Sequence, residues 1–143
     1  MRLTSYTNYA LRTLMYAALA HPRLVRVQDV ADAYGISKTH LVKCVHHLGI
    51  WGYLINQRGR NGGFRLARPP ETISVAEIVR RTEEGFGSPA CGDADTAVLR
   101  LVGAVQRAQA AFLAVLERYT IADMTANADD LRPILGFDVD RAA

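Results

Sequence analysis

A group of polar and cationic side chains is spaced so that one face of a short helix would present all of them. A helix over residues 37–48 turns by about 100° per residue. Its polar face would then contain five residues: Thr39, His40, Lys43, His46 and His47. Ser37 and Lys38 lie at the helix start, where free backbone N–H groups can bind a phosphate. Such a face has the donors that reading base edges in the DNA major groove requires.

A basic, glycine-rich hairpin is expected to follow this helix. Residues 54–58 and 64–68 are predicted strands, and the three glycines at 59, 62 and 63 permit a tight link between them. Four arginines surround the hairpin, Arg58, Arg60, Arg65 and Arg68, and Asn61 follows Arg60 at its tip. Arg60 and Asn61 at its tip are placed to enter the minor groove or to bind its phosphates.

Other chemistry for these residues has weaker support. The 59–63 loop lacks the Lys-Ser/Thr pair and the strand-to-helix setting of a nucleotide phosphate loop. His46 and His47 are adjacent, so they point about 100° apart on a helix, and a third metal ligand is not in reach. A nucleophile–base pair, a carboxylate pair with a pocket and a cofactor fingerprint are all missing from the sequence, so we expect no enzyme and no catalytic residue.

The elements that would position this face form a helix-turn-helix. Residues 5–19 and 27–34 are predicted helices, and Gly35 suits the left-handed conformation that ends the second. The third helix has an apolar stripe opposite its polar face: Leu41, Cys44, Val45 and Leu48. The fold class expected is mainly α with a small β-wing: a winged helix-turn-helix followed by a long C-terminal dimerisation helix.

Charge is divided unevenly between the two halves of the chain. Residues 1–70 contain ten Lys or Arg and two acids, a formal charge of +8, whereas residues 71–143 contain seven and twelve, a charge of −5. A polyanion such as DNA would bind the first half and be repelled by the second. The chain of 143 residues has only two cysteines, too few for a disulfide framework, so a cytoplasmic protein is expected.

A long helix over residues 95–119 carries an apolar seam. Seven residues recur in steps of three and four: Val98, Leu101, Val105, Ala108, Phe112, Val115 and Tyr119. Three heptads of this spacing favour a coiled-coil dimer interface, which also suits the two-fold symmetry of a palindromic operator. The alternative is a helix packed inside its own domain. Arg100, Gln106, Arg107 and Gln109 argue against a membrane span, and we expect no membrane contact.

Four segments are expected. They are a DNA-binding domain over 1–82, a sensor-type loop over 83–94, a dimerisation helix region over 95–124 and a poorly ordered tail over 125–143.

Several ordered motifs resemble one family. They are MRLTS (1–5), NYALR (8–12), ISKTHLVK (36–43), LG (48–49), GY (52–53), RGRNGG (58–63), AFL (111–113) and RYTIAD (118–123). The chain is similar to the bacterial winged-helix regulators that include the iron–sulfur regulator IscR, the nitric-oxide sensor NsrR and the cysteine regulator CymR, and most similar to the NsrR branch. The resemblance covers roughly residues 1–124. It implies a homodimeric repressor that binds a palindromic operator and senses a redox, nitrosative or iron-related signal.

The resemblance also implies a sensor loop before the long helix, where cluster-binding members hold iron–sulfur through three cysteines. This sequence has only Cys91 there, and Leu99 occupies the position of the last family cysteine. Asn8 and Arg12 stand where some members place a first-helix ligand. Iron–sulfur clusters need about four ligands, mostly thiolates. We therefore expect no cofactor and no metal of the usual kind.

Two interpretations remain for Cys91 and two for the function of the protein. Cys91 is either a redox-sensing thiol or a residue without a role, and nearby acids would lower its reactivity. The leading function is an operator-binding repressor. The alternative is a cluster-free regulator or adaptor that acts through protein partners or a small-molecule effector.

Overall fold

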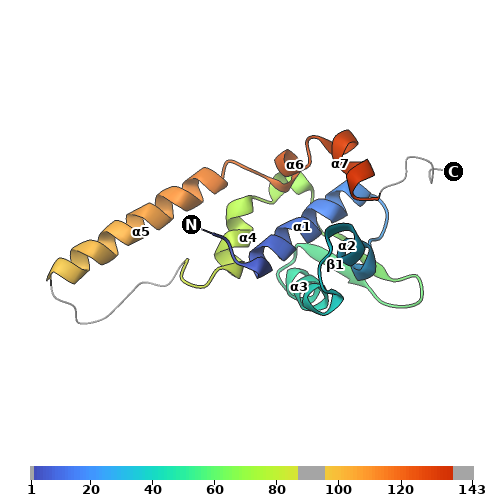
Figure 1. The fold of residues 1–143 in the computed structure, drawn as a ribbon, viewed down its shortest axis with the longest axis horizontal. Coiled ribbons are helices and arrows are strands. Elements are labelled where there is room, and N and C mark those ends of the chain that lie inside the picture. The colour runs from blue at the N-terminus through green and yellow to red at the C-terminus, as the bar shows by residue number, and fades with distance from the viewer. Residues whose placement is uncertain (1, 87–95, 137–143) are drawn as a thin grey trace.

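The computed structural model describes residues 2–86 and 96–136 and has the expected fold class (Figure 1). Helices α1 (Ser5–Ala20), α2 (Val27–Tyr34) and α3 (Lys38–Ile50) precede a hairpin of β1 (Leu54–Gln57) and β2 (Gly63–Leu66). A short 3-10 turn, η1 (Pro70–Thr72), leads into α4 (Val75–Thr82). The chain continues through α5 (Thr96–Leu116), α6 (Ile121–Met124) and α7 (Ala128–Ile134). The prediction of a mainly helical protein with a small β-wing is confirmed.

The helix-turn-helix is held by apolar side chains from all three of its helices. Leu14 of α1 and Leu41 and Leu48 of α3 are fully buried, and the whole stripe predicted on α3 faces inward. Gly35 ends α2 with φ 63°, in the left-handed conformation predicted for it. Burial of each large aliphatic side chain stabilises the domain by about 1.5–3 kcal/mol.

The wing is joined to the loop between α1 and α2. Strands β1 and β2 are antiparallel, with Leu54 opposite Leu66 and Gln57 opposite Gly63. Val25 exchanges two backbone hydrogen bonds of 2.8 Å with Phe64, which is fully buried. A side chain at Gly63 would place its Cβ 2.6 Å from the carbonyl oxygen of Val25. The glycine is therefore needed because the two backbones approach closely.

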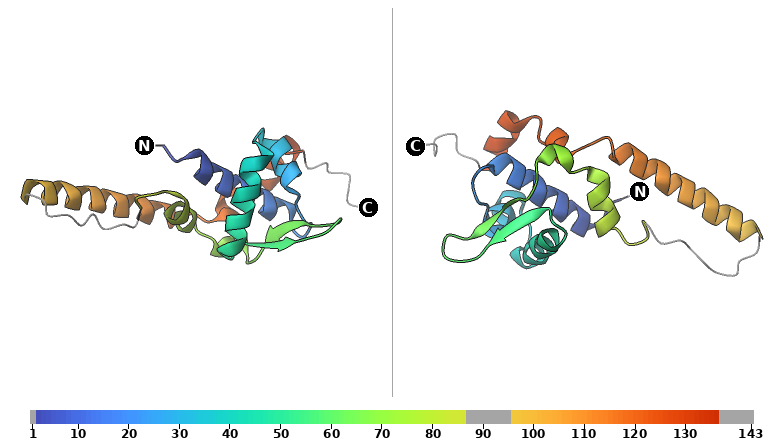
Figure 2. Two further views of the ribbon diagram at one scale, coloured as in Figure 1. Left: turned by 90° about the horizontal axis from the view of Figure 1, so that it is seen from below. Right: turned by 180° about the vertical axis from the view of Figure 1, so that it is seen from behind.

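Helix α5 leaves the domain, and the chain then returns to it. Figures 1 and 2 show α5 extending away from the winged helix-turn-helix, while α6 and α7 lie against α1. Beyond α5, the backbone N–H of Val75 donates to Tyr119, and that of Ile121 donates to Ile73. Ile121 is fully buried, so the C-terminal end of α5 is anchored to the domain.

Two helix ends are set by particular residues. Thr4 caps α1, because the Thr4 hydroxyl accepts the Thr7 N–H. Helix α3 runs to Ile50, two residues beyond its predicted end at residue 48. A Cβ at Gly49 would lie 2.5 Å from the Asn56 amide nitrogen, so the glycine provides space there.

The tail also differs from its prediction over its described part. Helix α7 forms within residues 125–136, and buried Leu135 packs on the core. Arg132 also donates to the carbonyl oxygen of Leu19 at the end of α1, 3.4 Å away. The apolar residues of α7 are too few to give a clear periodic pattern.

A hydrogen-bond network joins the first turn of α1 to the end of α4. The Glu83 carboxylate accepts from the backbone N–H and hydroxyl of Thr4 and from the hydroxyl of Thr7. Thr7 is fully buried and also bonds the Thr82 hydroxyl at 2.8 Å. Partial burial raises the pKa of Glu83, but these hydrogen bonds outweigh it and hold the pKa below its usual value. The charged carboxylate is thus a structural tie between α1 and α4.

This tie predicts a pH-dependent loss of stability. Glu83→Gln should lower the free energy of unfolding at pH 7 by about 1 kcal/mol, because it removes charge-assisted hydrogen bonds. Because the pKa of Glu83 is lower in the folded protein than in the unfolded chain, its charge stabilises the fold when the pH is above the unfolded pKa of about 4.3. The stabilisation is lost as the pH falls through the folded pKa. In urea denaturation, the difference in free energy of unfolding between the wild type and Glu83→Gln should therefore become smaller from pH 7 towards pH 3.

Glu84→Gln is the matched control for this prediction. Glu84 is the exposed neighbour of Glu83, and its substitution should change stability by less than about 0.5 kcal/mol. A Glu83→Gln difference that stays constant with pH would contradict a role for the charge.

Candidate DNA-binding surface

The polar face predicted on α3 is exposed as one surface. Lys38 and Thr39 lie at its start and Lys43 at its middle, all solvent-exposed, as are Ser37, His40, His46 and His47. Opposite them, Cys44 is fully buried and Val45 nearly so. Because the inward stripe packs on α1 and the wing, the polar side chains are left facing solvent together. Ser37 occupies the N-cap position but its side chain makes no capping hydrogen bond.

Aromatic residues of α1 contact two of the α3 histidines. The Tyr6 hydroxyl forms a 2.5 Å hydrogen bond with His47 Nδ1. Tyr9 stacks on His40, with ring planes 15° apart and centroids 6.1 Å apart. His47 also contacts Trp51, at a centroid distance of 5.6 Å. The sequence pattern did not indicate these contacts, which depend on how α1 crosses α3.

The wing places its basic tip in solvent. Arg58, Arg60, Asn61 and Arg65 are all exposed, as the sequence predicted. The hairpin projects beyond the helices in both views of Figure 2. Gly59, with φ 111°, lies in the link between Arg58 and Arg60 and allows the chain to reverse there. The structure thus brings an exposed α3 face and an exposed cationic tip into one domain.

Arg68 is a correction to the predicted set of wing arginines. Its guanidinium forms a bidentate pair with Glu77 at 2.7 and 2.9 Å and lies over the ring of buried Tyr53. Arg81 contacts the same ring and donates to the Tyr53 hydroxyl. Arg68 therefore joins the base of the wing to α4, and the sequence could not distinguish this role because its partners come from another helix.

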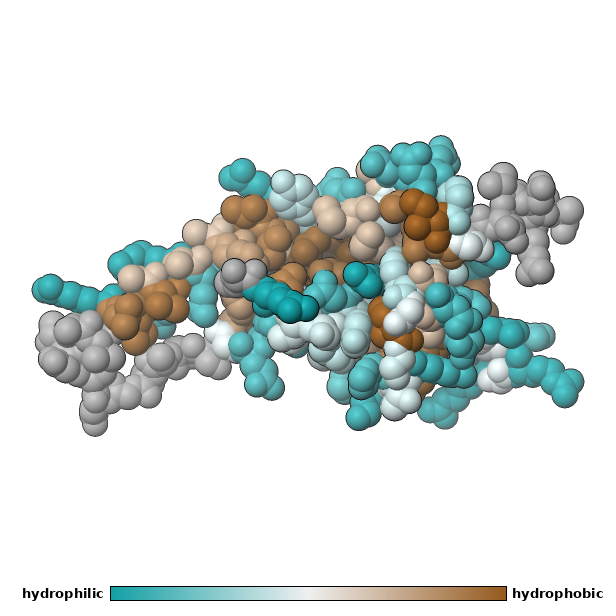
Figure 3. Space-filling model, viewed as in Figure 1, coloured by the Kyte–Doolittle hydropathy of each residue, from teal (hydrophilic) through white to brown (hydrophobic). Residues whose placement is uncertain are grey.

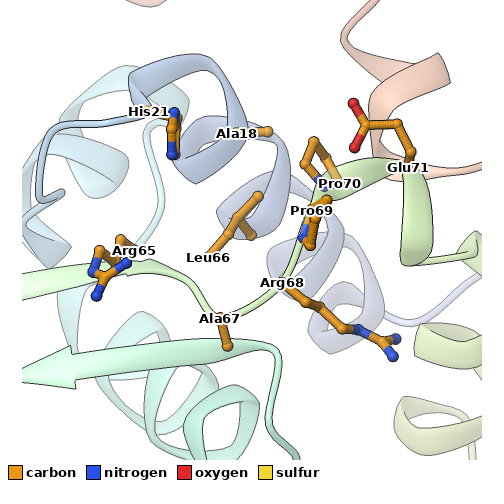
Figure 4. Close-up of a pocket in the computed structure, with 9 residues that line it drawn as sticks. All are labelled: Ala18, His21, Arg65, Leu66, Ala67, Arg68, Pro69, Pro70 and Glu71. Atoms are coloured by element: carbon orange, nitrogen blue, oxygen red, sulfur yellow. The ribbon is translucent and has the colours of Figure 1, made fainter.

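The sequence prediction missed basic groups from the loop between α1 and α2. A pocket of about 500 Å³ separates the end of α1 from β2, and His21 and Arg65 both line it (Figure 4). Arg26 follows Val25, which pairs with Phe64 of the wing, so it lies beside the hairpin. The high positive charge of residues 1–70 indicated a basic surface, but it could not show that these side chains lie near the wing.

The described residues do not supply the ligands of an iron–sulfur cluster. Cys44 is buried, and burial raises the pKa of its thiol to about 12 despite an opposing hydrogen bond with Thr13. Asn8 uses its amide to donate to the Thr4 carbonyl, and the Arg12 guanidinium lies over Tyr34. Within residues 2–86 and 96–136, no three His, Cys, Asp or Glu side chains gather as a metal site. Cys91 lies outside the described residues.

The predicted seam of α5 is largely uncovered. Leu101, Val105, Val115 and Tyr119 are exposed by 64%, 49%, 54% and 46%. Ala108 is also exposed, whereas Phe112 is half-buried against Phe86. Hydrophobic surface runs along much of this helix in Figure 3. The side chain of Val98 lies outside the described residues.

By length and composition, the segment Leu99–Leu116 could also cross a membrane, with a mean hydropathy of 1.3. It contains Arg100 and Arg107, both exposed. Charged side chains within a membrane span are costly.

Known proteins match nearly the whole chain. The model of the Rrf2 family, described as an iron-dependent transcriptional regulator, matches residues 3–127. The HTH-type transcriptional regulator NsrR of Shouchella clausii is 46% identical over 96% of this chain and 97% of that protein. NsrR of Bacillus subtilis is 40% identical over 94% of this chain and 97% of its own length.

Solved structures share the fold. The cysteine regulator CymR of B. subtilis has a TM-score of 0.74 at 21% identity, covering 89% of this chain and 98% of that one. IscR of T. potens has a TM-score of 0.71 at 23% identity, covering 91% and 90%. The resemblance in the sequence motifs is thereby confirmed. The chain belongs to the Rrf2 family of winged helix-turn-helix transcriptional regulators, which are DNA-binding proteins and not enzymes.

Proposed function

We propose that this chain is a homodimeric repressor that binds a palindromic operator through α3 and the wing. The observation that carries the proposal is the exposed polar face of α3, which lies opposite the buried apolar stripe of the same helix. A helix of this kind presents donors to the major groove, and Lys38 and Lys43 add cationic contacts to the backbone. Arg60 and Asn61 at the wing tip then contact the neighbouring minor groove.

The uncovered face of α5 supports a dimer. Its exposed seam residues are spaced for a coiled coil, and burying a Leu or Val side chain contributes about 1.5–3 kcal/mol. A second copy of the chain has the same seam, so a two-fold axis along α5 would cover both faces. The same axis would present two α3 helices to successive major grooves, about 34 Å apart.

A redox or nitrosative signal is supported by the relatives named NsrR. The segment 83–94, which contains Cys91, lies between the DNA-binding domain and α5. In a cytoplasmic regulator, this segment would connect the signal to the DNA-binding domain and to α5.

Leu99 at the last ligand position favours a second candidate function. It is a regulator without a conventional cluster that responds through Cys91, a small molecule or a protein partner.

Selection from a randomised duplex library tests the proposed function. The wild-type protein should enrich an inverted repeat whose half-site centres are about one helical turn apart, or a multiple of it. Affinity for the enriched duplex should fall steeply with salt concentration, because phosphate contacts release counterions. If the selection enriched no DNA sequence, the proposed binding to an operator would be contradicted.

Substitutions in the wing and in α3 should have different effects on DNA binding. Arg60→Ala should weaken binding to every duplex and reduce the salt slope by about 1, because it removes a phosphate contact. Thr39→Ala or His40→Ala should cost about 1–3 kcal/mol only on the preferred duplex, because base contacts carry sequence information. Titrations of the enriched and a scrambled duplex measure both effects. Equal losses on both duplexes for every variant would contradict the assignment of α3 as the reading element.

The seam of α5 makes a prediction with a matched control in the same helix. Leu101→Asp should dissociate the dimer, because it buries an unpaired carboxylate between the two helices. Leu99→Asp introduces the same charge at a side chain of comparable exposure, 54%, that lies off the seam, and should leave the dimer intact. Sedimentation equilibrium distinguishes the two outcomes. Dissociation by both variants, or by neither, would contradict the predicted seam.

Cofactor content is tested by anaerobic purification. With one loop cysteine and Leu99, the protein should be colourless and contain iron and acid-labile sulfide well below one equivalent per chain. Near-stoichiometric iron with visible absorption would show that non-cysteine or shared ligands hold a cluster. In that case Cys91→Ser should remove the colour if Cys91 is one of those ligands.

A further inference from the structure

We propose that Tyr6 is a positioning residue that holds His47 with its Nε2–H directed to an acceptor on a DNA base. The inference rests on the proposed reading role of α3 and adds a specificity-determining pair that spans two helices. Tyr6 comes from the first turns of α1 and His47 from the last turns of α3. Their side chains meet in a hydrogen bond between the phenol oxygen and Nδ1.

The proposed role requires the Tyr6 hydroxyl to be the donor in this hydrogen bond. Partial burial raises the pKa of Tyr6 above its ordinary value, so the phenol keeps its proton at neutral pH. In the proposed arrangement this O–H donates to Nδ1 of a neutral imidazole. A neutral imidazole carries one ring proton, which this contact places on Nε2.

The resulting donor has a defined set of targets. Guanine O6 and N7, adenine N7 and thymine O4 are the acceptors in the major groove. With the opposite tautomer, Nε2 would instead accept from cytosine or adenine amino groups. Tyr6 therefore selects which base edges His47 can bind.

A second residue, just beyond the end of α3, contacts the ring of His47. Trp51 lies one turn further along, with ring planes 31° apart, and the Arg81 guanidinium lies 5.8 Å from the centroid of the Trp51 ring. Tyr6 is held in its turn, because Thr4 and Thr7 on either side of it bind Glu83. The Nδ1 atom of His47 is thus held by a hydrogen bond from another helix, whereas His46 contacts the ring of His47 itself.

The ordering of His47 gives a reason for selectivity. A side chain held before binding loses less conformational entropy when it contacts DNA. Its favoured tautomer also makes the wrong base unfavourable, because a buried donor or acceptor would be left unpaired.

Tyr6→Phe tests the inference because it deletes the hydroxyl and keeps the ring. The probes are the duplex that the wild-type protein enriches and its single-base-pair variants. His47→Ala first identifies the base pair at which preference is lost. Tyr6→Phe should lower discrimination at that same base pair by about tenfold, while binding to a scrambled duplex and the salt slope stay unchanged.

A double-mutant cycle separates positioning from a general effect on the fold. In the His47→Ala background, Tyr6→Phe should cause no further loss of discrimination, because the residue it acts through is gone. A full additional loss in that background would overturn the proposal. Tyr34→Phe is the control, since it removes the hydroxyl of another half-buried tyrosine, one that packs on Tyr16 and Arg12.

Nitrogen-15 NMR of the imidazole rings gives a readout that needs no DNA. The wild type should show His47 with Nδ1 unprotonated and Nε2 protonated, and Tyr6→Phe should lower the fraction of His47 in that tautomer. An unchanged His47 tautomer would overturn the proposal. If the wild type enriches no DNA sequence, the proposed function fails and this role with it. If a sequence is enriched but His47→Ala leaves discrimination intact, only this inference fails.

Discussion

Burial of the apolar stripe of α3 against α1 is the interaction on which the reading surface depends. Leu41, Cys44 and Leu48 are completely removed from solvent, and Leu14 of α1 is equally buried. A helix that loses one side to the core must present the opposite side outward. The exposure of Lys43 and the histidines is therefore a consequence of packing and needs no separate cause.

Helix α1 connects the reading surface to the rest of the molecule. It contacts α3, α4, α6 and β2, and Thr7, one of its buried polar residues, is hydrogen-bonded to Thr82 at the end of α4. Two residues near that end, Arg81 and Glu83, contact the supports of His47: Arg81 lies over Trp51, and Glu83 binds the turn that contains Tyr6. A displacement of this end of α4 would thus change how His47 is held. The segment from residue 83 towards α5 is where the family resemblance expects a sensor.

Helix α5 is an apolar helix with little cover from its own domain. It is 21 residues long and mostly apolar, yet within the described residues its contacts with the domain lie in its C-terminal half, where Gln109 donates to the carbonyl oxygen of Gly85 and Phe112 contacts Phe86. Exposed apolar patches of this kind mark interaction sites in soluble proteins. Arg100 and Arg107 on the same helix favour a protein partner over lipid.

The sequence by itself determined the elements whose periodicity or local chemistry is strong. The inward stripe of α3, the left-handed Gly35 and the capping box of Ser74 with Glu77 follow from residues within one or two turns of each other. The exposure of the predicted DNA-facing residues also followed, because a 3.6-residue period assigns each side chain to one face. The family was recognisable because several such local motifs occur in order.

Only the tertiary structure decided which side chains meet across elements. Arg68 looked like another wing cation, but Glu77 and Tyr53 hold it in a structural role. Tyr6 and Tyr9 of α1 contact His47 and His40 of α3, which are far from them in the chain. Helix α7 was missed because its few apolar residues gain their order from contact with the core. Residues far apart in the chain come together through the crossing angles of packed helices, and no local pattern encodes those angles.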